Sequence, residues 1–135
     1  MRNRTQGFTM IELIVVIVIL GILAATALPK FIDLNSDAKA AALKGVVGAA
    51  ASSMTINYSG CAVTQHVVTA NKCKKVDNCD DLGSLMQGGI PTGYTIAAVA
   101  LGTGNAGSNG VEATCTITQT DGSATGTFTG VSAGN

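Results

Sequence analysis

The sequence predicts an α+β protein in which one long N-terminal helix packs on a small antiparallel sheet of three to four strands. Two observations predict the helix: residues 8–28 form a continuous apolar run, and apolar residues then recur at helical spacing up to about residue 58. A third predicts the sheet: after Pro91 the chain contains segments of β-branched and small residues separated by turns. The first half of the helix is predicted to be transmembrane, and the second half amphipathic, covering the sheet.

The apolar run is 21 residues long and carries one charge, that of Glu12. As a helix it spans roughly 30 Å, the thickness of the hydrocarbon core of a bilayer. Arg2 and Arg4 precede it and hold that end on the cytoplasmic side, which places the rest of the chain on the other face. A secretory signal peptide is an alternative, but its apolar core is shorter, and residues 24–27 form only a weak cleavage site.

Glu12 is the residue that a plain membrane anchor does not explain. A carboxylate near the start of an apolar run costs up to ~2–3 kcal/mol on insertion scales, so a function and a partner are expected for it. The alternative is that Glu12 lies near enough to the interface to be solvated.

The sequence GFTMIE at residues 7–12, followed by the apolar run, resembles the type IV prepilin signature. Residues 1–38 look like a type IVa pilin, and residues 27–34 are similar to the branch of MSHA-type major pilins. The resemblance implies that a prepilin peptidase cuts between Gly7 and Phe8. It also implies that the new amine of Phe8 is methylated and that the mature subunit polymerises through its apolar helix.

This resemblance divides the chain into a leader peptide (1–7), a transmembrane and polymerisation helix (8–28) and a periplasmic or extracellular globular domain (29–135) that includes the second half of the long helix. In the family reading, the Phe8 amine of a neighbouring subunit pairs with Glu12. Such a pair sets the register of assembly, because a misplaced subunit leaves a buried charge unpaired.

One helix is expected from Phe8 to about Asn57, with Ser59-Gly60 ending it. Pro29 removes a backbone hydrogen bond, so a kink or local break is expected there. Gly21 is also a weak helix former. By resemblance, the segment between Gly21 and Pro29 loses helical order in the assembled filament, and a simple kink is the alternative.

Residues 61–92 are predicted to be mostly loop, with a short helix at 79–87 that Asn78 would cap. Strands are predicted at 94–101, 111–118 and 124–131, with a hairpin turn at Asp121-Gly122. These three strands would form an antiparallel meander covered by the second half of the long helix.

The chain has four cysteines: Cys61, Cys73, Cys79 and Cys115. All lie beyond the apolar run, on the side of the membrane where disulfides persist. Three pairings are possible and the sequence does not choose between them. We favour Cys61–Cys73, which closes a local loop, and Cys79–Cys115, which resembles the C-terminal disulfide loop of pilins but joins a more distant partner. A zinc site is the rival, but its closely spaced cysteine pairs are absent.

Charge and side-chain chemistry exclude several function classes. Cleavage after Gly7 would leave six basic residues against eight acidic ones, and no polybasic patch for nucleic acid. No catalytic set accompanies the lone His66, so neither an enzyme, a cofactor nor a metal is expected.

We therefore expect a structural subunit, a major pilin, that waits in the inner membrane and then forms an extracellular type IV pilus (fimbrium). Its partners would be further copies of itself, the prepilin peptidase and the pilus assembly machinery. A role in adhesion is compatible, as is one in motility or DNA uptake; adhesion would reside in the loops at 61–78 and 102–110, with no receptor assigned. The alternative is a type II secretion pseudopilin, which a calcium site of clustered acidic residues near the chain end would favour; Glu112 and Asp121 stand apart. A membrane-anchored enzyme or binding domain is a remote third.

Overall fold

The computed structural model describes residues 7–103 and 107–135, without the side chains of residues 27–33. Two sequence expectations fall at least partly outside these residues: the positions of Arg2 and Arg4, and part of the 102–110 loop.

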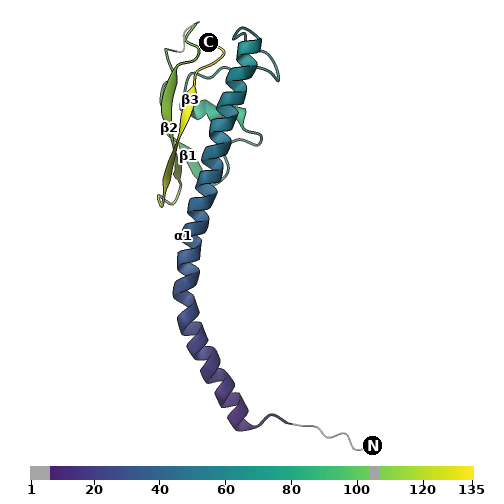
Figure 1. Ribbon diagram of the computed structural model, residues 1–135, viewed down its shortest axis with the longest axis vertical. Helices are drawn as coiled ribbons and strands as arrows, with labels where there is room; N and C mark the ends of the chain where they lie inside the picture. Colours follow the sequence, from purple (N-terminus) through teal and green to yellow (C-terminus); the bar gives the residue numbers. More distant parts are fainter. Residues whose placement is uncertain (1–6, 104–106) are drawn as a thin grey trace, which may run out of the picture. The chain divides into compact units, whose positions relative to one another are not determined.

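The fold is the expected α+β arrangement of one long helix and a three-stranded antiparallel sheet (Figure 1). Its elements are α1 (Met10–Val63), the 3-10 helix η1 (Cys79–Asp81), α2 (Leu82–Leu85), β1 (Tyr94–Ile96), β2 (Glu112–Gln119) and β3 (Thr125–Val131).

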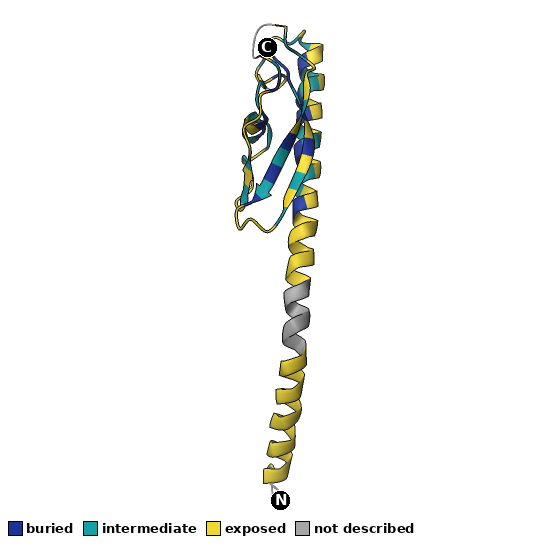
Figure 2. Ribbon diagram, turned by 90° about the vertical axis from the view of Figure 1, so that its left-hand side faces the viewer, coloured by how far each residue is buried: buried dark blue, intermediate teal, exposed yellow. Residues whose placement is uncertain are grey.

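The chain divides into two compact units, residues 1–39 and 40–135, and α1 contributes to both. In the first unit the large apolar side chains from Met10 to Leu23 are exposed, as the yellow turns in Figure 2 show. Among the residues that the structure describes, no helical stretch combines the length and the hydropathy needed to traverse a bilayer. The second unit, which we call the head, contains the core and the sheet.

The strands follow one another in the order β1-β2-β3, which is the predicted meander. Tyr94 lies opposite Gln119, and Cys115 lies opposite Phe128. Gly122 at the predicted hairpin turn has a positive φ of 71°, a conformation that glycine adopts without strain. The Asp121-Gly122 turn and the alternation of buried and exposed residues therefore set the register of this hairpin.

The core of the head lies between the end of α1 and one face of the sheet. Leu43, Ala50 and Met54 of α1 are buried in one cluster with Ile117 and Phe128 of the sheet. Apolar residues of the helix thus cover the alternating inward positions of β2 and β3, as the amphipathic pattern predicted.

Two glycines of β3 allow this close packing. A Cβ atom at Gly126 would lie 2.6 Å from a methyl carbon of Val47, and one at Gly130 would lie 2.5 Å from the sulfur of Cys115. Both positions face the core, so only a residue without a side chain fits between the strand and its neighbours.

The helix end and the first strand differ from expectation. The sequence predicted that Ser59-Gly60 ends the helix, but α1 continues to Val63. The cause is tertiary: Gly60 packs on the Lys72 backbone, where a Cβ would lie 2.0 Å from the carbonyl oxygen. The helix ends after Val63, where Gln65 and His66 adopt positive φ.

The first strand stops at Ile96 rather than continuing to Leu101. Beyond it the chain turns to another partner, since Cys79 N–H donates to Val99 O and Leu101 N–H donates to Asp77 O. The expected helix at 79–87 is also shorter. Asn78 is the N-cap residue, as predicted, and Asp81 completes a capping box: its carboxylate accepts the N–H groups of Asp77 and Asn78.

Candidate functional site

The start of α1 is closed by a reciprocal pair of side chains, Thr9 and Glu12. The Thr9 backbone N–H and hydroxyl both donate to Glu12 Oε2, at 3.2 and 2.9 Å, and the Glu12 N–H donates to Thr9 Oγ1 at 3.3 Å. This is a capping box, which satisfies backbone donors that a helix start otherwise leaves unpaired.

A function was expected for Glu12 from the sequence, but none was expected for Thr9. The signal was present, because Thr-x-x-Glu ahead of an apolar run is the capping-box pattern. In the single chain the Glu12 carboxylate therefore has a local hydrogen-bond partner, and any partner gained in an assembly must compete with Thr9 or join it.

Apolar side chains surround this polar pair. Phe8 is 83% exposed and Ile11 69% exposed, and a row of large apolar residues follows them. Glu12 is the one acidic or basic residue between positions 8 and 28. A surface of this size in contact with water is unfavourable, so it needs a lipid or protein cover.

The other predicted sites in this unit lie along the same helix. Gly7 is exposed, with nothing within 4 Å of where its Cβ would stand, and lies two residues before Thr9 of the capping box. A Cβ atom at Gly21 would likewise have nothing within 4 Å, and α1 is continuous through both Gly21 and Pro29. The predicted loss of helical order concerns the filament, so it stays a prediction.

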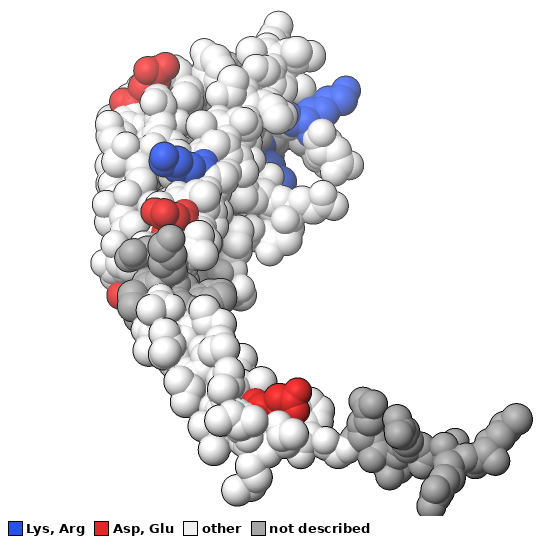
Figure 3. Space-filling model, turned by 60° about the horizontal axis from the view of Figure 1, so that its bottom comes forward, with Lys and Arg blue, Asp and Glu red and all other residues white. Residues whose placement is uncertain are grey.

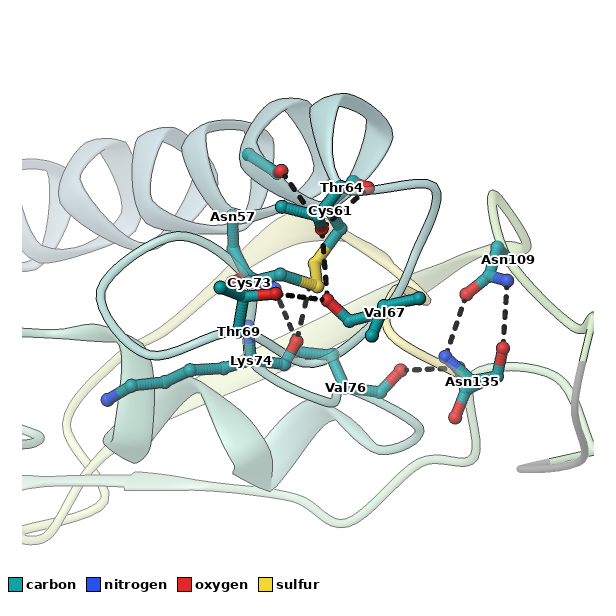
Figure 4. The surroundings of a disulfide bond; sticks show 11 residues. Asn57, Cys61, Thr64, Val67, Thr69, Cys73, Lys74, Val76, Asn109 and Asn135 are labelled. Atoms are coloured by element: carbon teal, nitrogen blue, oxygen red, sulfur yellow. Dashed lines mark hydrogen bonds between the residues drawn. A yellow bond between two sulfur atoms is a disulfide. The ribbon is translucent and has the colours of Figure 1, made fainter.

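The head is held by two disulfides, Cys61–Cys73 and Cys79–Cys115, the pairing we favoured. The first joins the last turns of α1 to the following loop. Beside it, the Asn57 side chain donates to Lys74 O and accepts the Lys74 N–H, both at 2.9 Å (Figure 4). The second ties η1 to β2 within the core.

The disulfide-bonded loop carries the single histidine of the chain. The imidazole ring of His66 packs at a tilt against the ring of Tyr58, with the two ring centroids 5.4 Å apart. No group of three or more potential metal ligands occurs among the described residues. All four cysteines are used in the disulfides, which leaves none for zinc.

Part of the 102–110 loop is pinned rather than free. Asn109 Nδ2 donates to Asn135 O and Asn109 Oδ1 accepts the Asn135 N–H, at 3.0 and 2.9 Å (Figure 4). Asn135 Nδ2 also donates to Val76 O at 3.0 Å. Sequence reasoning missed this clasp, because the pattern offers no local signal for a contact between residues 26 positions apart.

Comparison with known proteins identifies this arrangement. Residues 2–28 match the prokaryotic N-terminal methylation motif. The chain is 34% identical over 92 residues to the type IV narrow pilus major component PilA5 of Thermus thermophilus, covering 68% of this chain and 69% of that protein. The chain belongs to the type IV pilin family.

Two further relatives define the range of this family. The type IV major pilin protein PilA of Myxococcus xanthus is 31% identical, over 72% of this chain and 39% of its own length. The type II secretion system core protein G of Pseudomonas aeruginosa is 43% identical, over 39% of this chain and 37% of its own length. No solved structure matches the chain.

Pilins and pseudopilins are structural subunits rather than enzymes, and they assemble into filaments. The long helix with an exposed apolar segment and the helix-covered sheet are therefore the two parts of a filament subunit. Pilus components are extracellular when assembled, and the methylation motif implies a membrane precursor.

Proposed function

We propose that this pilin is the major subunit of a type IV pilus. The prepilin peptidase cleaves it after Gly7, and the Phe8 amine is then methylated. The mature chain is held in the inner membrane by residues 8–28 until the pilus assembly machinery adds it to an extracellular filament. The observation that carries the proposal is the methylation motif at residues 2–28, which includes Glu12 inside a long exposed apolar helix.

The proposed assembly contact joins the Phe8 amine of one subunit to Glu12 of the next. Cleavage creates a positive charge next to an exposed apolar surface, and Glu12 is the acidic residue within that surface. Inside a bundle of apolar helices a single unpaired charge is costly, so the pair favours one register over the others.

A type II secretion pseudopilin is the second candidate. The match to core protein G favours it locally, at the highest identity of the three relatives described. The match to the Thermus pilus component favours a pilus instead, since it extends over two thirds of both chains. Roles in adhesion, motility or DNA uptake belong to the same proposal, without a receptor.

Intact mass and N-terminal sequencing of protein sheared from cells test the proposal. We expect an abundant chain that begins at methylated Phe8, with its mass lowered by the four hydrogens of two disulfides. A matured chain that is scarce in the sheared fraction and appears only when secretion genes are overexpressed would favour the pseudopilin. A chain that still begins at Met1 would contradict both candidates.

A further inference from the structure

A small cavity of about 230 Å³ opens on the head beside the first disulfide. Its lining comes from α1, the loop at 71–74 and α2: Ser53, Ile56, Asn57, Asn71, Lys72, Cys73, Lys74 and Leu85. Pockets that hold whole small-molecule ligands are typically about 300–1,000 Å³. This cavity is therefore better suited to one side chain.

The walls of the cavity are held in place. The Cys61–Cys73 disulfide and the paired hydrogen bonds between Asn57 and the Lys74 backbone fix the loop to α1. The Lys74 ammonium donates to Ser84 O and so links the loop to α2. A partner that enters such a preformed cavity loses little free energy to ordering its walls.

The cavity combines an apolar side with positive charge. Ile56 is 71% exposed and Leu85 lines the same space. Lys72 and Lys74 stand at the loop, while Lys75, outside the cavity, pairs with Asp77 at 3.0 Å. Among the described residues the Lys72 ammonium has no ion-pair partner. Charged side chains are sparse on the face of the molecule that Figure 3 shows.

The chain also carries exposed carboxylates that the described head leaves unpaired, those of Asp80 and Glu112. Neither lines the cavity. Neither carboxylate pairs with Lys72 within the described head, so such a pair would need a second copy. A contact between two different patches of the same chain is head-to-tail, and repeated contacts of that kind generate open helical filaments when they do not close into a ring.

We propose that the Lys72 cavity receives a carboxylate side chain, Glu112 or Asp80, from the head of a second copy in the filament. This inference rests on the proposed pilus function and adds a contact between heads to the contact between helices. Lys72 forms the ion pair, Lys74 supports it, and Ile56 and Leu85 contact the carbon atoms of the entering side chain.

A zero-length carbodiimide tests the contact in intact filaments, because it joins an amine to a carboxylate only where the two touch. We expect the cross-linked dimer, digested and analysed by mass spectrometry, to contain Lys72 joined to Glu112 or Asp80. The Lys75–Asp77 pair, 3.0 Å apart in one chain, is the internal positive control. Lys72→Gln lacks the amine, so it should remove this cross-link and lower the dimer yield. It should also weaken the association between subunits about fivefold, the factor for one partly exposed ion pair.

Two matched variants separate the effect of the Lys72 charge from the reactivity of its amine and from its position in the cavity. Lys72→Arg keeps the charge but cannot form the amide, so it should lose the cross-link and keep the wild-type stability of the filament. Lys44→Gln removes an exposed lysine of α1 outside the cavity and should change neither.

The inference fails if filaments carry methylated Phe8 but their dimers link through other residues, or if Lys72→Gln leaves the dimer yield unchanged. It also fails if Lys72→Gln filaments form normally and lose only binding to an acidic polysaccharide, since the cavity would then serve an outside ligand. Absence of filaments from wild-type cells would instead refute the proposed function.

Discussion

Thr9 and Glu12 hold each other at the start of α1, with each residue both donating and accepting a hydrogen bond. In the single chain these hydrogen bonds hold the Glu12 carboxylate in one position. Cleavage after Gly7 would leave this pair intact. The new amine would then be on Phe8, one residue before Thr9.

The first prediction concerns this capping box. Thr9→Val should expose the backbone donors at the start of α1 and destabilise the first turn by ~1 kcal/mol. Hydrogen exchange of the amides of residues 9–12 in detergent should then be about fivefold faster. Thr9→Ser keeps the hydroxyl and should exchange like the wild type; equal exchange in Thr9→Val would show that the pair is dispensable.

The second prediction concerns Glu12 itself. Glu12→Ala should still enter the membrane but lower the filament yield at least about tenfold, because an uncompensated charge in an apolar interface costs several kcal/mol. Membrane fractionation and the sheared-filament yield measure the two effects separately. Asp37→Asn removes another exposed carboxylate of α1 and should assemble normally. A normal yield from Glu12→Ala would remove the proposed register contact.

The third prediction ranks the two disulfides. Cys79–Cys115 closes a segment of 36 residues and Cys61–Cys73 one of 12. On the loop-entropy model, removing Cys79–Cys115 by double Cys→Ser substitution should lower the free energy of unfolding by roughly 4 kcal/mol. Removing Cys61–Cys73 in the same way should lower it by roughly 3 kcal/mol. Denaturant unfolding of the detergent-solubilised chain gives both values. The reverse order would show that local packing, rather than loop length, sets their contributions.

The fourth prediction concerns the close packing of β3. Gly130→Ala should destabilise the head by ~1–3 kcal/mol, since the new methyl group overlaps the Cys115 sulfur and Leu101. Gly45→Ala is the matched control: its position in α1 is open, and the gain in helix propensity should stabilise the chain by ~0.5–1 kcal/mol. Thermal melting of the two variants should therefore shift in opposite directions, and a neutral Gly130→Ala would indicate that β3 can move away from Cys115.

The sequence by itself determined the features that depend on residues close together in the chain. The apolar run around Glu12, the helical period after it and the Asp121-Gly122 turn each indicate their structure within a few residues. They predicted the long helix, the antiparallel meander and the family resemblance.

Only the tertiary structure decided where elements stop and which distant residues meet. Contact with the Lys72 backbone carries α1 past Ser59-Gly60, and hydrogen bonds to the 77–79 segment end β1 early. The choice among three disulfide pairings, the Asn109–Asn135 clasp and the Lys72 cavity likewise depend on residues far apart in the chain. Such contacts form only when the packed core brings those segments together, so no local pattern records them.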